Sequence, residues 1–185
     1  MIWLVLGMIL FIGVHLGGSV AAWRAAMVER LGEGVYKGLY ALISLIGLVL
    51  AGFGYGRAEA AWVWTPLQFG HEAAAAIMPV AVVLLTAAYM PTNVKRLTAH
   101  PMLWGVVLFA IAHLLVRGDW ASIVLFGGLG VYSLLAMVMA TIRGERPSSR
   151  VRPLWNDALM IAVGLVFYVV LLLAHPILFG VAVVN

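Results

Sequence analysis

Apolar residues run along the chain in six long segments, which short polar stretches separate. Each segment can form a helix about long enough to cross a hydrocarbon core roughly 30 Å thick. Because the polar stretches are short, consecutive helices are expected to pack as antiparallel hairpins. The pattern therefore predicts an all-α polytopic membrane protein with a single transmembrane domain over 1–185. Its six helices are placed at Ile2–Ala22, Val35–Tyr55, His71–Met90, Ala99–Val116, Trp120–Ile142 and Asn156–Val183.

Composition indicates that lipid is the solvent for most of the chain. Of the 185 residues, 65% are hydrophobic and 10% are charged, and the mean hydropathy is +1.10. A soluble domain cannot bury so much apolar surface. The net charge is only +4, so the basic pI does not indicate nucleic-acid binding. The sequence contains no cysteine, which excludes disulfides, thiolate metal ligands and cysteine nucleophiles.

Lys and Arg are distributed unequally between the two sides of the predicted bundle. The polar stretches after the first, third and fifth helices hold nine of them, and the other side holds only Arg57 and Arg117. Cytoplasmic loops carry the excess of Lys and Arg, so both termini are predicted to be non-cytoplasmic. The first segment is interpreted as a retained helix rather than a signal peptide, because basic residues follow it and none precedes it. The nine basic residues on the predicted cytoplasmic side are Arg24, Arg30, Lys37, Lys95, Arg96, Arg143, Arg146, Arg150 and Arg152.

Glycines mark the predicted sites of close helix packing. Helix association in lipid depends on such small residues, because apolar side chains gain nothing by leaving an apolar solvent. The candidates are Gly13 and Gly17, Gly52 and Gly56, and the group Gly127, Gly128 and Gly130.

The five histidines are the main candidates for chemistry. His71 and His100 each begin a predicted helix, where an interfacial or capping role is the simpler interpretation. His15, His113 and His175 lie within apolar segments. An ionisable side chain in hydrocarbon is costly, and one that persists there usually lines a cavity, pairs or binds a ligand.

Helical spacing gives two of these histidines an apolar, aromatic setting. His113 shares a stripe with Phe109 and Met102, and His15 shares one with Phe11. Such a stripe suits either an axial haem ligand or a structural histidine at a helix contact. No H-E-x-x-H or similar zinc pattern occurs, so haem is the favoured cofactor hypothesis.

Other polar residues have simpler structural interpretations. His175 precedes Pro176, which favours a kinked helix end with the imidazole hydrogen-bonded locally. Asp119 and Asp157 are each predicted to be N-caps of the helices that follow them. No nucleophile constellation and no glycine-rich phosphate loop is found.

Several motifs together resemble the NnrU family of bacterial membrane proteins, and the resemblance covers essentially the whole chain. That family is associated with nitrite and nitric oxide metabolism in denitrifying bacteria. It is similar to the plant zeta-carotene isomerase, an integral membrane enzyme that isomerises a cis double bond using haem b. The motifs are HPMLWG at 100–105, AHLL at 112–115, GDWASIVLFG at 118–127, FIGVH at 11–15 and LYALIS at 39–44.

The resemblance implies that His15 and His113 are the two axial ligands of haem b. The isomerase also has a cysteine three residues before its second histidine, where this chain has Ala110. On straight helices the two histidines are offset by about 12 Å along the membrane normal. His175 and His71 match the depth of His113 better and are the reserve ligands.

Three functions remain as expectations. The first is a haem b protein of the bacterial inner membrane, in redox chemistry or sensing linked to nitrite and nitric oxide, with a small diatomic ligand. The second is a haem-dependent cis-trans isomerase of a carotenoid-like lipid. The third is a cofactor-free accessory protein that binds other membrane proteins in the lipid bilayer.

Overall fold

The computed structural model describes residues 1–181 and 183, and this part of the chain is helical without a regular strand. Every predicted apolar segment is a helix, so the all-α prediction is confirmed. The helices are α1 (Ile2–Ser19), α2 (Ala21–Leu31), α3 (Glu33–Gly56), α4 (Gly70–Tyr89), α5 (Val94–Leu97), α6 (Pro101–Val116), α7 (Trp120–Ser122), the π-helical η1 (Ile123–Gly127), α8 (Gly128–Ile142) and α9 (Leu154–Phe179).

Five of these elements are long and apolar enough to cross a membrane: α1, α3, α4, the continuous α7–η1–α8 and α9. The sixth apolar helix, α6, has 16 residues. Large apolar side chains cover the outside of the bundle; Leu173 is 71% exposed and Ile177 87% exposed. Such exposure would be unfavourable in water and suits lipid. The fold is therefore that of a multi-pass membrane protein.

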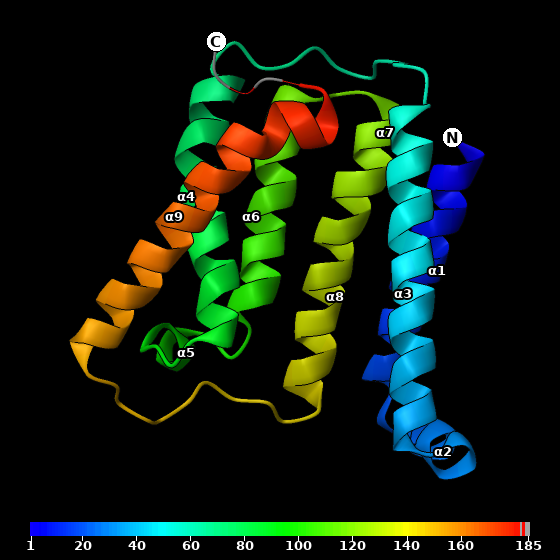
Figure 1. Ribbon diagram of the computed structural model, residues 1–185, viewed down its shortest axis with the longest axis vertical. Helices are drawn as coiled ribbons and strands as arrows, with labels where there is room; N and C mark the ends of the chain where they lie inside the picture. Colours follow the sequence, from blue (N-terminus) through cyan, green and yellow to red (C-terminus); the bar gives the residue numbers. More distant parts are fainter. Residues whose placement is uncertain (182, 184–185) are drawn as a thin grey trace.

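The helices form two groups joined by α8 (Figure 1). On one side α1 packs against α3, and on the other α4 packs against α6 and α9. Helix α8 lies between the groups and contacts both α1 and α6. The candidate histidines of α1 and α6 therefore flank the same central helix.

The predicted end of the first helix at Ala22 is wrong, because α1 ends at Ser19. Val20 is extended, with φ −86° and ψ 107°, and α2 begins after it. Gly32 then turns the chain into α3 with φ +79°, a region that L side chains rarely adopt. Helix α2 mixes charged and apolar residues, which is why its sequence did not stand out as an apolar segment.

The stretches predicted to be cytoplasmic gather at one end of the bundle (Figure 1). We call it the basic end; it comprises α2, α5 and residues 143–153. Arg143 donates from its guanidinium to the Ser19 carbonyl oxygen, and the Ser148 amide donates to the Lys95 carbonyl. The N-terminus and the end of α9 lie at the opposite end.

The end opposite the basic end is closed by backbone pairing between two loops, 61–67 and 115–120, which we call the loop cap. The amide of Val63 donates to the Gly118 carbonyl at 2.8 Å, and that of Trp120 donates to the Ala61 carbonyl at 3.0 Å. Gly118 is required there, because a Cβ would collide with the carbonyl oxygen of Trp64.

Close packing between α1 and α3 depends on glycines other than those predicted from the sequence. A Cβ on Gly47 would lie 2.7 Å from the Phe11 amide nitrogen, and one on Gly7 or Gly54 would meet the backbone of the other helix as closely. The predicted contacts at Gly13, Gly52 and Gly56 are wrong, because these glycines face open space. A Cβ on Gly17 would meet only the Trp23 side chain, at 3.4 Å, and one on Gly127 only Ile123, at 3.9 Å. Gly128 and Gly130 do lie in close contacts, because a Cβ there would be 2.9 Å from Met8 and 3.1 Å from Ala110, respectively.

Asp157 is not the predicted N-cap. Helix α9 begins at Leu154, so Asp157 lies inside the helix, in its first turn. Its carboxylate accepts from the Thr92 hydroxyl and from the amide and side-chain nitrogens of Asn93. The residue therefore fastens α9 to the start of α5 rather than capping its own helix.

Candidate functional site

His113 lies one turn before the end of α6, in an aromatic setting. Its Nδ1 hydrogen-bonds to the Phe109 carbonyl oxygen at 2.8 Å. A carbonyl oxygen only accepts, so Nδ1 carries the proton and Nε2 keeps its lone pair. The ring lies 4.1 Å from that of Phe109 and stacks on Phe126 at 4.3 Å, with 25° between the planes.

Phe126, which stacks on His113, lies in an irregular turn. Residues Ile123–Gly127 form a π-helix between α7 and α8. A π-turn changes the direction of the side chains within it and is often found at functional sites. Here it accompanies a buried Phe126 that contacts the rings of His113, Phe109 and Tyr55.

His15 has the same local arrangement on α1. Its Nδ1 hydrogen-bonds to the Phe11 carbonyl oxygen at 2.6 Å, which again leaves the Nε2 lone pair available. The Phe11 ring lies 4.3 Å away, Tyr40 of α3 lies 5.1 Å away and Tyr132 of α8 lies 5.8 Å away. The imidazole is thus surrounded by aromatic rings from three helices.

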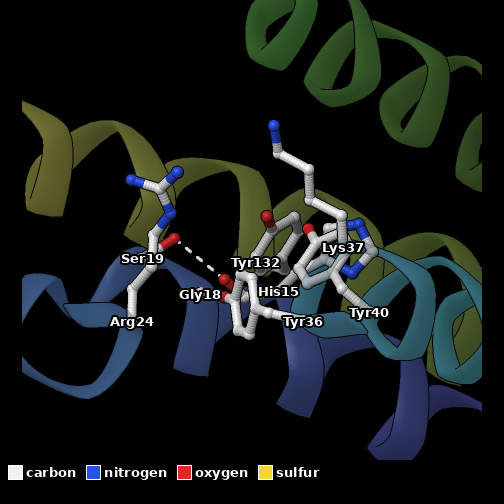
Figure 2. A pocket seen from close by; sticks show the side chains of 8 residues that line it. All are labelled: His15, Gly18, Ser19, Arg24, Tyr36, Lys37, Tyr40 and Tyr132. Carbon is white, nitrogen blue, oxygen red and sulfur yellow. Dashed lines mark hydrogen bonds between the residues drawn. The ribbon is translucent and has the colours of Figure 1, made fainter. Parts of the chain in front are cut away.

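A cleft of about 310 Å³ opens beside this histidine, and we call it the His15 pocket (Figure 2). It lies between α1, α2, α3 and α8. Its volume is at the lower end of the range of small-molecule sites. The lining residues are His15, Gly18, Ser19, Arg24, Tyr36, Lys37, Tyr40 and Tyr132.

The two histidines lie toward opposite ends of the bundle, but their rings are displaced toward each other. Each imidazole bonds the carbonyl four residues back, so it covers the preceding turn of its helix. Helices α1 and α6 run in opposite directions (Figure 1), so the two displacements converge. The rings still contact different residues of the central helix, Phe126 and Tyr132, which are separated by about 9 Å along the axis.

Two of the other three histidines, His175 and His71, are less suited to bind a ligand. The predicted local hydrogen bond of His175 is confirmed, because its Nδ1 bonds the Val181 carbonyl at 2.7 Å. Its ring lies 4.9 Å from that of Phe179 on the same helix. His71 is exposed in the first turn of α4. His100 is the N-cap residue of α6, followed by Pro101 as predicted, but its side chain makes no capping hydrogen bond.

His100 lines a second cleft, of about 490 Å³, at the basic end. Its Nε2 is buried and lacks a partner among the described residues. The cations of this cleft are already engaged: Lys95 Nζ donates to the Ala88 carbonyl, and Arg143 donates to the Glu145 carboxylate. The cleft shares Ser19 and Tyr132 with the His15 pocket, so the two are neighbours.

A buried polar network holds the end of α6 that carries His113. Asp119 is 1% exposed, and the prediction that it caps the next helix is confirmed. Its carboxylate accepts from the Ser122 amide and hydroxyl and from Nε of Arg117. The Ser122 hydroxyl also bonds Tyr55 of α3, so the network connects the loop cap to a second helix.

Stability should depend on the charge of Asp119. Burial raises the pKa of this carboxyl, but the hydrogen bonds from Ser122 and the Arg117 guanidinium outweigh burial and hold it below its ordinary value. A carboxyl with a lowered folded-state pKa stabilises the fold above its unfolded pKa, about 3.9, and loses this contribution as pH falls through the folded value. Thermal unfolding in detergent between pH 3 and 8 should therefore show an acid-side loss of stability below about pH 4.

The variant Asp119→Asn separates this effect from general acid denaturation. It should unfold at a lower temperature at neutral pH and lose less stability toward pH 3. Glu59→Gln, which neutralises an exposed carboxyl in the 57–69 loop, is the matched control. If Asp119→Asn and the wild type lost the same unfolding temperature between neutral pH and pH 3, the stabilising role of the Asp119 carboxylate would be contradicted.

The fold and the histidine sites together define a helical multi-pass membrane protein with two partly buried, oriented imidazoles. Comparison with known families then gives its relationship. The model of the NnrU protein family matches residues 3–183, and the chain belongs to this family. Searches of curated proteins and of solved structures find no match.

Proposed function

We propose that this chain binds haem b between its transmembrane helices through His113 and His15, and serves redox chemistry or sensing linked to nitrite and nitric oxide in the bacterial inner membrane. The observation that carries the proposal is shared by both histidines. Each imidazole holds its Nδ1 proton on a backbone carbonyl and keeps the Nε2 lone pair, as neutral histidine ligands to metals do.

The donor chemistry of the site suits haem rather than zinc. Neutral imidazoles with aromatic neighbours are typical haem ligands, and the rings of Phe11, Tyr40 and Phe126 supply flat apolar surfaces. Within residues 1–181 and 183, no three His, Asp or Glu side chains gather as a metal-binding group. When bound, haem would supply one-electron chemistry and affinity for a diatomic gas.

The protein's own contribution is orientation and exclusion of water. The carbonyls of Phe11 and Phe109 fix the tautomer and direction of the two imidazoles, and such hydrogen bonds also increase the basicity of the ligand nitrogen. The stacked Phe126 limits the motion of His113 and keeps solvent from one face of its ring. Two firmly held histidines favour electron transfer or sensing over catalysis at the iron.

The carotenoid isomerase alternative gains no support from this site. In the plant enzyme, a cysteine three residues before the second histidine is implicated in a ligand change. Here the corresponding Ala110 is 3% exposed and contacts Gly130, and it has no redox chemistry. The isomerase function would require another route for releasing a histidine.

An absorption spectrum of the detergent-purified protein, prepared with haem supplied, tests the proposal. We expect a Soret band in the oxidised form and sharp α and β bands after reduction with dithionite, as six-coordinate haem gives. A colourless protein that does not take up added haem would refute the proposal and leave the accessory function. Co-expression with a cis-carotene, followed by chromatography of the pigments, tests the isomerase alternative.

A further inference from the structure

The His15 pocket has an uneven charge. Two of its eight lining residues, Arg24 and Lys37, are cationic, and none of the eight, all of which the structure describes, is acidic. Its remaining lining is mainly aromatic and neutral, with three tyrosines and His15. A site of this composition complements a flat ligand whose negative charge lies at one edge.

The turn at the basic end brings the two cations to one rim. Arg24 is in the first turn of α2, and α2 begins directly after the extended Val20. Lys37 is on α3, three residues before Tyr40, so its Cα lies about 4.5 Å from that of Tyr40 along the axis, toward the basic end. Figure 2 shows the guanidinium of Arg24 and the ammonium of Lys37 on the same side of the pocket.

Neither cation is firmly committed elsewhere. Lys37 forms an exposed pair with Glu33 one turn back on α3, at 2.8 Å with side chains 65% and 61% exposed. Such a pair is weak and readily exchanged. For the Arg24 guanidinium, no hydrogen bond or ion pair is found with any residue that the structure describes. The second cleft differs, because Glu145 already pairs with Arg143 there.

We propose that Arg24 and Lys37 bind the two propionate carboxylates of haem b. This inference rests on the proposed function and deepens it. The carboxylate oxygens accept charge-assisted hydrogen bonds from the guanidinium and the ammonium, which are the stronger kind. This arrangement would place the carboxylate edge of the haem toward the basic end.

Titration with two porphyrins tests this assignment. Apo protein in detergent is titrated with haem b and with iron protoporphyrin dimethyl ester, which has the same ring but no carboxylates, and Kd is obtained from the Soret absorbance. The variants are Arg24→Gln, Lys37→Gln and the double variant. Arg150→Gln removes the same charge from an exposed position at the basic end and is the matched control.

Each single variant should weaken haem b binding by about tenfold and the double variant by more. The Kd for the dimethyl ester should stay the same in all variants. Arg24→Lys and Lys37→Arg keep the charge and should restore most of the affinity for haem b. The affected side chains are exposed, so circular dichroism and thermal unfolding should match the wild type.

Each of the following outcomes would overturn the assignment. The double variant could bind haem b as tightly as the wild type does. Alternatively, Arg150→Gln could weaken haem b binding as much as Arg24→Gln or Lys37→Gln does, which would indicate a nonspecific charge effect. The double variant could also lose both porphyrins to the same extent, which would indicate a structural role. If the wild-type protein binds haem b no more tightly than the dimethyl ester, this inference is refuted but the proposed function is not. If the wild-type protein binds neither porphyrin, the proposed function is refuted as well.

Discussion

Replacing His113 by alanine should abolish the Soret band of the purified, haem-supplied protein. The substitution removes the Nε2 lone pair, and Phe109 and Phe126, which flank the ring, offer no ligand atom in its place. Haem content, measured by the pyridine haemochrome assay, should fall at least tenfold. Because His113 is only partly buried, the helical content measured by circular dichroism should be unchanged.

Parallel variants identify the second ligand. His15→Ala should give the same loss of the low-spin spectrum, whereas His175→Ala and His71→Ala should keep it. The His175 ring packs against Phe179 of its own helix, whereas the rings of His15 and His113 contact aromatic side chains of other helices. His71 is exposed at the start of α4. If His15→Ala kept the low-spin haem spectrum and His175→Ala lost it, the second ligand would be His175 of α9 instead of His15. An intact spectrum in His113→Ala would contradict the site altogether.

Gly54→Leu should be the most destabilising single substitution between α1 and α3. Any Cβ at this position meets the backbone of Leu4, which cannot move as a side chain can. We expect a loss of about 3 kcal/mol or more in the free energy of unfolding, since overpacking against backbone exceeds the usual cost of a crowded core. Reversible unfolding in mixed detergent micelles measures the change.

Gly52→Leu is the matched control for this prediction. It places the same side chain on the same helix two residues earlier, where nothing lies within 4 Å. The expected change is within about 0.5 kcal/mol, as for a surface substitution. Equal destabilisation by both variants would show that the loss comes from the helix itself and not from its contact with α1.

The sequence predicted the helices well because their signal is local. A long apolar segment must satisfy its backbone hydrogen bonds within itself when the solvent is lipid, so it forms a helix wherever it is placed. The cap at Asp119 and the pairing of each buried histidine with an aromatic residue four positions back follow from the same local geometry. Ionisable residues in apolar segments made His15, His113 and His175 candidates, and the resemblance to the NnrU family singled out His15 and His113.

Features that depend on which helices meet were missed. Glycine spacing does not show which face of a helix meets a partner, so Gly52 was selected and Gly54 was not. Phe126 and Tyr132 contact different histidines, and which helix each of them faces depends on how α6 and α1 pack against α8. Lys37 and Arg24 were recognised only as topology signals; their place on one pocket rim depends on the turn at Val20.

The loop cap and the two clefts lie toward opposite ends of the bundle, so the two ends should differ in permeability. Backbone hydrogen bonds tie 61–67 to 115–120 at one end, while residues of the basic end, Arg24 and Lys95 among them, line the clefts. Protons and small solutes would therefore exchange with the interior from a single aqueous compartment. If haem binds as proposed, its reduction potential should therefore respond to pH in the compartment at the basic end.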